Sequence, residues 1–217
     1  MSYSRINPSP RYLALQDLYR TMHQEGEKFL GIRPEDTFPG KSLMPQVHRI
    51  KALVDKTGAQ TILDYGSGKG KQYGAATLRD AAGKQYPGVL DYWDIEEVVC
   101  YDPCYAPYSK YPEGKFDGVI STDVLEHCPE EDIPWIVNEL FSFAASFVFA
   151  NVACYPATKR LPTGENAHCT IQPMAWWRDL FAEIAGRHPG IRWEVWVVSR
   201  VDSPDGTKLV EDRIGSD

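Results

Sequence analysis

The sequence predicts an α/β fold built on a mostly parallel sheet. From residue 61 to residue 154, short apolar runs alternate with segments of helical periodicity, which is typical of parallel strands joined by helices. The longest run, 146–154, is nearly continuous, as expected for a strand covered on both faces. After residue 192 the pattern alternates and turns back at 203–208, which predicts a C-terminal antiparallel hairpin.

Composition indicates one globular domain with an N-terminal extension. The chain has 217 residues, of which 43% are hydrophobic, enough for one sizeable core. We expect a helical arm or cap over residues 1–42 and one domain over residues 43–217. A formal net charge of −7 gives no general attraction to phosphate backbones, so a nucleic-acid partner is not expected. The five cysteines show no paired spacing and no apolar run is long, so we expect a soluble, reduced, cytoplasmic protein without a membrane partner.

The remaining elements are predicted from periodicity and from Gly and Pro punctuation. Helices are expected over residues 12–29, 43–56, 71–82 and 133–145, over a short insertion within 86–97, and from Pro173 onward. Strands are expected to begin at Thr61 and to cover residues 98–101, 118–121, 146–154, 192–200 and 208–211. Loops are expected over residues 31–40 and 155–172.

The stretch Asp64-Tyr-Gly-Ser-Gly-Lys-Gly70 predicts a strand that ends in a glycine turn. Glycines at alternate positions indicate a backbone that approaches a neighbour closely, and we expect that neighbour to be a nucleoside-bearing cofactor. A dinucleotide fingerprint needs a third glycine where Lys71 stands, so NAD is not expected. The alternative is an ordinary glycine-rich turn between a strand and a helix.

A second acid ends the next strand. Asp102 follows the apolar run 98–101 and precedes Pro103. A carboxylate at such a strand end can accept both hydroxyls of a ribose. An Asp-Pro pair alone is more typical of a turn, but beside the glycine stretch it favours a nucleoside site.

The third stretch, Phe116-Asp-Gly-Val-Ile-Ser-Thr-Asp-Val-Leu-Glu-His127, predicts a buried strand followed by the start of a helix. The strand opens at its carboxyl end onto Thr122 and Asp123. Ligands of doubly wound sheets bind outside such strand ends, so these two residues are candidates for contact with the same ligand.

Together, the three stretches resemble the class I S-adenosylmethionine-dependent methyltransferases. The first resembles motif I of that family and the third resembles its fourth-strand motif, and the resemblance covers roughly residues 43–212. It implies a Rossmann-like fold, S-adenosyl-L-methionine as the cofactor, and methyl transfer to a small molecule such as a sugar or a nucleotide. The cofactor contacts that it implies are Asp64, Gly66, Ser67, Gly68, Gly70, Asp102, Pro103, Thr122 and Asp123.

The chain departs from the family pattern after Asp102. Only 13 residues, 103–115, precede Phe116, and they are too short and too rich in proline for the usual helix and third strand. We therefore expect a truncated third-strand region at the edge of the sheet. The residue that holds the adenine amino group cannot be transferred, and Cys104 and Tyr105 are the candidates to replace it.

Two histidines compete for the role of general base. A hydroxyl acceptor benefits from a base near the reacting oxygen. His168 lies in the loop 155–172 after the fifth strand, and we expect it to face the acceptor. His127 follows Glu126 on the predicted helix, where the alternative is that both residues only cap and pack that helix.

Asp123, Glu126, His127 and His168 also bear a partial likeness to metal-dependent small-RNA 2′-O-methyltransferases. Those enzymes carry an acid-x-x-Glu-His run and a later histidine that coordinate a divalent cation. The acidic charge of this chain favours a small hydroxylated acceptor over RNA, and we expect no metal. A third alternative is a catalytically inactive cofactor-binding partner protein, against which the polar loop around His168 argues.

Overall fold

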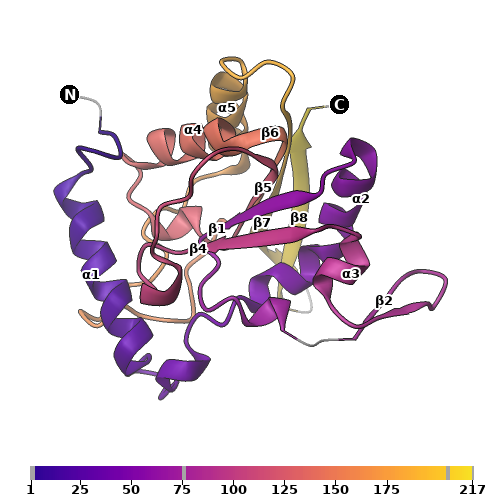
Figure 1. Cartoon of the computed structure of the whole chain (residues 1–217). Helices are drawn as coiled ribbons and strands as arrows, with labels where there is room; N and C mark the ends of the chain where they lie inside the picture. Colours follow the sequence, from indigo (N-terminus) through magenta and orange to yellow (C-terminus); the bar gives the residue numbers. More distant parts are fainter. Residues whose placement is uncertain (1–2, 75–76, 204–205, 217) are drawn as a thin grey trace.

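The computed structural model describes residues 3–74, 77–203 and 206–216, which contain a six-stranded sheet of order β4-β1-β5-β6-β7-β8 (Figure 1). Its strands are β1 (Thr61–Tyr65), β4 (Glu97–Tyr101), β5 (Phe116–Thr122), β6 (Ala144–Ala153), β7 (Arg192–Ser203) and β8 (Gly206–Gly215). Neighbouring strands are parallel except β7 and β8, which pair antiparallel. The predicted α/β class, with a mostly parallel sheet and a C-terminal hairpin, is confirmed.

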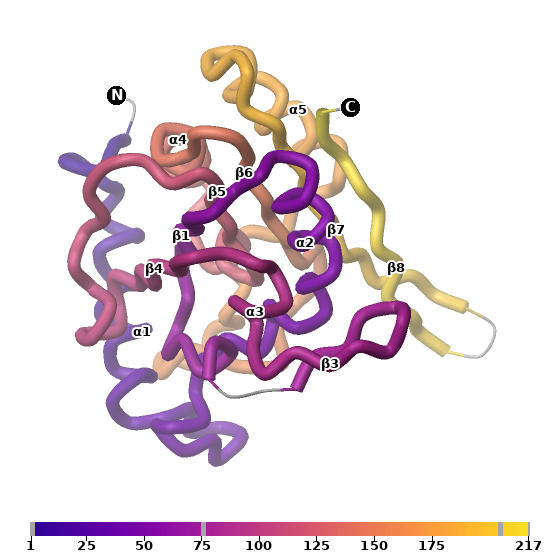
Figure 2. The backbone as a smooth tube through the Cα atoms, turned by 45° about the vertical axis from the view of Figure 1, so that its right-hand side comes forward, coloured from indigo at the N-terminus to yellow at the C-terminus, as the bar shows by residue number. Residues whose placement is uncertain are grey.

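Helices cover both faces of the sheet (Figure 2). One face carries α2 (Val47–Thr57) and α3 (Val89–Trp93), and the other carries α4 (Ile133–Phe143) and α5 (Met174–Ala185). Successive side chains of a strand point to opposite faces, so Ile62 packs in the core with α2 while Leu63 packs in the core with α4. None of the helices in the described residues is long and apolar enough to cross a membrane.

The order of the strands places a topological switch point at β1. The chain leaves β1 to form β4 on one side and then crosses back to form β5 on the other side. In open α/β sheets, ligands bind outside the carboxyl ends of the strands at such a point. These are the strand ends on which the three sequence stretches lie.

The edge of the sheet is truncated as predicted. Residues 102–115 form no strand, and the loop contains only the 3-10 turn η4 (Ala106–Tyr108). The N–H of Asp102 donates to the carbonyl of Tyr108 (3.0 Å), which folds the loop back onto the end of β4. β4 is therefore the edge strand.

The helix predicted over residues 71–82 is wrong. The described residues there form the 3-10 turn η3 (Lys71–Tyr73) and the short strand β2 (Leu78–Arg79), which pairs antiparallel with β3 (Gln85–Tyr86). Residues 75 and 76 lie outside the described residues. The Asp80 carboxylate accepts the backbone N–H groups of Ala82 and Lys84 (both 2.9 Å). Such local side-chain bonds to the backbone compete with a helix, and here they form a tight turn.

Several bounds differ from the prediction, most clearly those of α1 and β8. The first helix, α1, covers Pro10–Glu25 rather than residues 12–29, because Gly26 follows it and ends it. β8 is longer than the predicted 208–211, because it pairs with β7 from Ser203↔Gly206 to Glu194↔Gly215. The turn predicted at 203–208 includes residues 204 and 205, which lie outside the described residues.

The N-terminal segment lies across the end of the sheet toward which the parallel strands point (Figure 1). After α1 it forms the 3-10 turns η1 (Pro34–Asp36) and η2 (Lys41–Gln46), which lead into α2. Arg5 anchors its start: the guanidinium is ion-paired with Glu139 of α4 and donates to the hydroxyls of Tyr65 (2.7 Å) and Tyr101 (3.0 Å). The segment is thus held over the carboxyl edge by contacts with the strands themselves.

Candidate functional site

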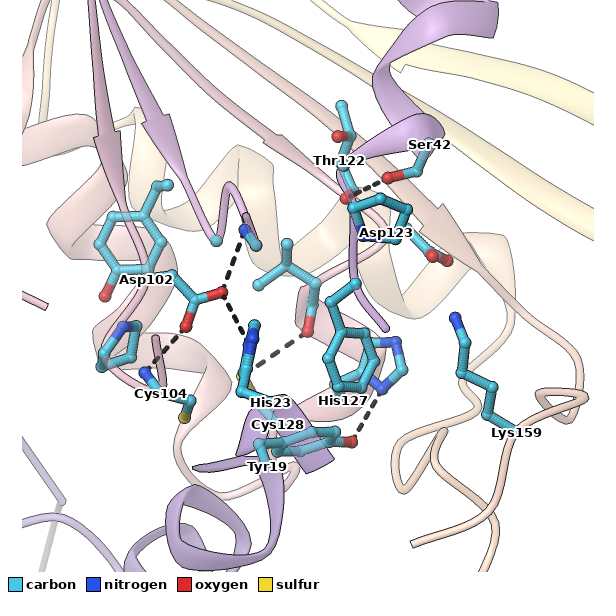
Figure 3. Close-up of a pocket in the computed structure, with 18 of the residues that line it drawn as sticks. Tyr19, His23, Ser42, Asp102, Cys104, Thr122, Asp123, His127, Cys128 and Lys159 are labelled. Atoms are coloured by element: carbon cyan, nitrogen blue, oxygen red, sulfur yellow. Dashed lines mark hydrogen bonds and ion pairs between the residues drawn. The ribbon is translucent and has the colours of Figure 1, made fainter. Parts of the chain in front are cut away.

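A cavity of about 410 Å³ lies between α1 and the carboxyl ends of β1, β4 and β5 (Figure 3). Its volume is that of a site for a small organic molecule. The residues predicted to hold a cofactor that line it are Gly66, Gly68, Asp102, Pro103, Thr122 and Asp123. The sequence therefore located the cavity at the correct edge of the sheet.

Asp64, Ser67 and Gly70 were also predicted to contact the cofactor, but they are not among the lining residues. The buried carboxylate of Asp64 accepts from Nε2 of Gln72 (2.9 Å) and from the hydroxyl of Tyr73 (2.8 Å). Burial raises the pKa of Asp64 to about 6, although these two bonds act in the opposite direction. Nε2 of Gln72 also donates to the carbonyl of Ser67 (3.3 Å), so this group of residues stabilises the glycine turn from behind.

The close approach predicted at the glycine turn is made by the protein itself. Gly66 and Gly68 have φ angles of +88° and +59°, in the left-handed region that favours glycine. A Cβ atom on Gly68 would overlap the carbonyl of Phe38, and one on Gly66 would overlap the side chain of Val124. These glycines make room for Phe38 and Val124, which form part of the cavity wall, and the contact with a cofactor stays a prediction.

Asp102 stands on the cavity wall at the end of β4. Its Oδ2 accepts the N–H of Gly68 (3.0 Å) and its Oδ1 accepts the N–H of Cys104 (2.8 Å). From α1, His23 places Nε2 3.8 Å from Oδ2, while its Nδ1 lies 2.9 Å from the Lys69 ammonium. An ammonium group only donates, so the hydrogen of the neutral His23 ring is on Nε2 and faces Asp102.

The two candidates for the adenine contact occupy different places. Cys104 lines the main cavity. Tyr105 lines a neighbouring hollow of about 210 Å³, where its ring stacks on His23 with a centroid distance of 5.0 Å. Cys104 also lines this hollow, together with His23 and Pro103, so these three residues form a wall common to the two spaces.

The chain turns sharply after β5. Asp123 has a φ angle of 60°, which is uncommon for a residue other than glycine, and its N–H donates to the carbonyl of Asn151 (3.0 Å). The helix predicted to start here is wrong, since only the 3-10 turn η5 (Leu125–His127) follows. The carbonyl of Glu126 accepts the N–H of Cys169 (2.9 Å) instead of continuing a helix. The turn sets the Asp123 side chain on the cavity wall.

Asp123, His127 and His168 meet at one end of the cavity, with one ligand-capable atom of each within 4.8 Å of the others. Nδ1 of His127 lies 2.9 Å from the carbonyl of Ala167, and Nδ1 of His168 lies 2.6 Å from the carbonyl of Tyr155. A carbonyl only accepts, so each neutral ring carries its hydrogen on Nδ1 and a lone pair on Nε2. Nε2 of His168 is 3.9 Å from the Asp123 carboxylate. The cluster therefore gathers acceptor atoms around one point.

Of the two histidines, His127 is on the cavity wall, and His168 is not among the lining residues. The ring centroids are 4.7 Å apart, and the hydroxyl of Tyr19 from α1 lies 2.8 Å from Nδ1 of His127 (Figure 3). Burial lowers the pKa of His127 to about 4 against the opposing charge of Asp123. The imidazole is thus neutral near pH 7, with Nε2 free to accept a proton.

Glu126 does not join the cluster. Its side chain is fully buried, and Oε1 accepts the N–H of Ala153 (2.5 Å), while Oε2 has no hydrogen-bond partner within the described part of the chain. Burial, with the charge of Asp123, raises the pKa of Glu126 well above its ordinary range. Glu126 therefore holds the end of β6 and the following loop rather than lining the cavity.

The lining residues that were not predicted as site residues include Tyr19, His23 and Lys159. The first two belong to α1, whose sequence carries helical periodicity but no sign of which surface the helix will cover. Lys159 belongs to the polar loop 155–172. The position of that loop after a buried strand was the one available signal.

No known protein family matches the sequence, and comparison with curated proteins and with solved structures found no significant similarity. The fold and the site define an α/β protein with a Rossmann-like sheet and a ligand-sized cavity at its switch point.

Proposed function

We propose that the protein is an S-adenosylmethionine-dependent methyltransferase that acts on a small-molecule acceptor. One observation carries the proposal: the three stretches that resemble this family meet around a single cavity at the switch point of the sheet. Six of the residues that the resemblance implies as cofactor contacts line this cavity.

The residues present fit such a cofactor. Each oxygen of Asp102 accepts one backbone N–H and keeps further lone-pair capacity, so the carboxylate can accept two ribose hydroxyls. Gly66 and Gly68 line the cavity near Asp102, and Thr122 and Asp123 line it at the end of β5. The walls from α1 are mostly apolar or aromatic, which helps to exclude water.

The chemistry divides between the cofactor and the cavity. When bound, the cofactor supplies an electrophilic methyl group with its own sulfur leaving group, so the protein mainly aligns the acceptor and excludes water. Nε2 of His127 would accept the proton of an acceptor hydroxyl. Asp123 then stabilises the imidazolium. His168 is not among the lining residues, so we assign the role of base to His127 rather than to His168.

Calorimetry tests the cofactor assignment. Titration of S-adenosylmethionine and of S-adenosylhomocysteine into the protein should show saturable binding at micromolar concentration. Absence of binding at millimolar concentration would overturn the proposal. Binding without turnover across a broad panel of acceptors would instead favour the inactive partner protein.

A second candidate, metal-assisted methyl transfer, is favoured by the convergence of Asp123, His127 and His168. Histidines that bind metals usually donate their other ring N–H to a carbonyl or carboxylate, as both of these do. A divalent ion held there would polarise an acceptor oxygen. Glu126, the fourth residue of the predicted ligand set, does not reach the cluster.

Binding of Mn²⁺ alone separates the two candidates. If the cluster holds a metal, calorimetry should show Mn²⁺ binding that His168→Gln abolishes. His188→Gln is the matched control, because His188 lies elsewhere and bonds to Asn138 (3.0 Å). No binding at millimolar Mn²⁺, together with activity that resists a chelator, would leave the acid–base mechanism.

A further inference from the structure

Two lysines line the cavity, Lys41 and Lys159, and of these Lys41 is exposed whereas Lys159 is half-buried. Lys159 lines the cavity, and no carboxylate of the described residues lies within ion-pair distance of its ammonium group. The acids on the same wall are otherwise engaged. Asp36 is paired with Arg33 (2.7 Å), Asp102 accepts two backbone N–H groups, and Asp123 faces His168 (3.9 Å).

The position of Lys159 is fixed by its surroundings. Its ammonium lies 5.0 Å from the centroid of the Phe38 ring, a cation–π contact, and the side chain is half-buried. Its carbonyl accepts the N–H of Ala167 (3.2 Å), in the segment that carries His168. The amide of Asn166 binds both the N–H and the carbonyl of Ala157 (both 2.9 Å). These contacts within the loop hold the Lys159 ammonium in place.

The ammonium is directed toward the reacting end of the cavity. In Figure 3 the Lys159 nitrogen points toward the corner formed by Asp123 and His127. Its charge also acts on the His127 ring in the direction that disfavours protonation. The whole chain carries a net charge of −7, so a general surface charge does not explain a cation at this point.

We infer that the acceptor carries an anionic group, a phosphate or a carboxylate, that binds the Lys159 ammonium beside His127. The inference rests on the proposed function, because only a methyltransferase has an acceptor. The negative charge of the ligand is inferred from Lys159. A half-buried ammonium without a counter-ion gains most from a ligand that supplies one, because a charge-assisted hydrogen bond is stronger than a neutral one. A hydrogen bond between the anionic group and Lys159 would also position an acceptor oxygen near Nε2 of His127.

Inorganic phosphate and acetate are the probes, and the ring resonance of His127, assigned with His127→Gln, is the local readout by NMR. Each anion is titrated into the free protein and into protein saturated with S-adenosylhomocysteine. Lys159→Met should weaken binding about tenfold or more, while Lys159→Arg should retain most of it. Lys110→Met is the control, because Lys110 is exposed and pairs only with Glu113.

Equal affinity of wild type and Lys159→Met for both anions would overturn the inference. Dependence on Lys159 for phosphate alone would assign a phosphorylated acceptor, and dependence for acetate would assign a carboxylate. Failure of S-adenosylhomocysteine to bind, with anion binding that still requires Lys159, would defeat the proposed function and leave the anion site in place.

Discussion

The two ends of the cavity differ in how their polar atoms are satisfied. At the Asp102 end, both carboxylate oxygens accept backbone N–H groups, and His23 is oriented by Lys69. At the Asp123 end, the carboxylate lies 3.9 Å from Nε2 of His168, and His127 completes a cluster with one ligand-capable atom of each residue within 4.8 Å of the others. Backbone donors hold the carboxylate at the first end, whereas the second end brings titratable side chains together. We therefore expect the Asp102 end to determine affinity and the Asp123 end to determine turnover.

The largest expected effect is at the Asp123 end. His127→Gln should lower kcat by about 10² to 10⁴, the usual contribution of a general base, while the affinity for S-adenosylhomocysteine stays unchanged. Steady-state kinetics and calorimetry measure the two quantities separately. His168→Gln should lower kcat less, since His168 is not among the residues that line the cavity.

His188→Gln serves as the control, because His188 is remote from the cavity and bonds to Asn138. If His127→Gln lowers the cofactor affinity as strongly as it lowers kcat, the two ends of the cavity do not have separate roles in binding and in turnover.

The next effect concerns the support of the glycine turn. Burial raises the pKa of Asp64 to about 6 from an ordinary value of 3.8, so the folded state binds a proton more tightly than the unfolded state. The free energy of unfolding contributed by this group is therefore highest below pH 4 and falls as the pH rises through 6, by about 3 kcal/mol in total. Asp64→Asn should remove this decrease.

Urea denaturation at several pH values between 4 and 7 measures the difference between Asp64→Asn and wild type. Asp202→Asn is the control, because Asp202 is exposed on β7. An unaltered pH dependence in Asp64→Asn would show that this carboxyl group does not titrate in that range.

A smaller effect is expected at the Asp102 end. Asp102→Asn should weaken binding of S-adenosylmethionine by about 1 to 3 kcal/mol, the cost of leaving buried polar groups without a charged partner. The kcat value at saturating cofactor should change little. Calorimetry with Asp202→Asn as the control measures the first quantity, and unchanged affinity would show that Asp102 serves only the turn at Gly68.

Local signals in the sequence were sufficient for most of the sheet. β1, β4, β5 and β6 follow from short apolar runs, and their order places Asp102 and Asp123 at one edge. The prediction of a helix over residues 71–82 was wrong, because the Asp80 side chain accepts the backbone N–H groups of Ala82 and Lys84 within a turn. The periodicity of apolar residues gives no information about such hydrogen bonds between a side chain and the backbone.

The other half of the cavity could not be predicted, because its contacts join distant parts of the chain. Tyr19 meets His127 across 108 positions, and His23 meets Lys69 across 46. Periodicity places α1 correctly as a helix but says nothing about the surface it covers. The motif residues define one wall of the cavity, and tertiary packing supplies the other.

The last prediction is that NADH does not bind to the protein. A dinucleotide site places the pyrophosphate at the N-terminus of the helix that follows the glycine turn. Here Lys71 occupies the place of the third glycine, and in the described residues after Gly70 no α-helix begins before Val89. Fluorescence titration of NADH should show no saturable binding up to millimolar concentration, and S-adenosylhomocysteine titrated by calorimetry under the same conditions is the positive control. Saturable micromolar binding of NADH would mean that the Asp102 end accepts a dinucleotide without that helix, and the cofactor assignment would have to be abandoned.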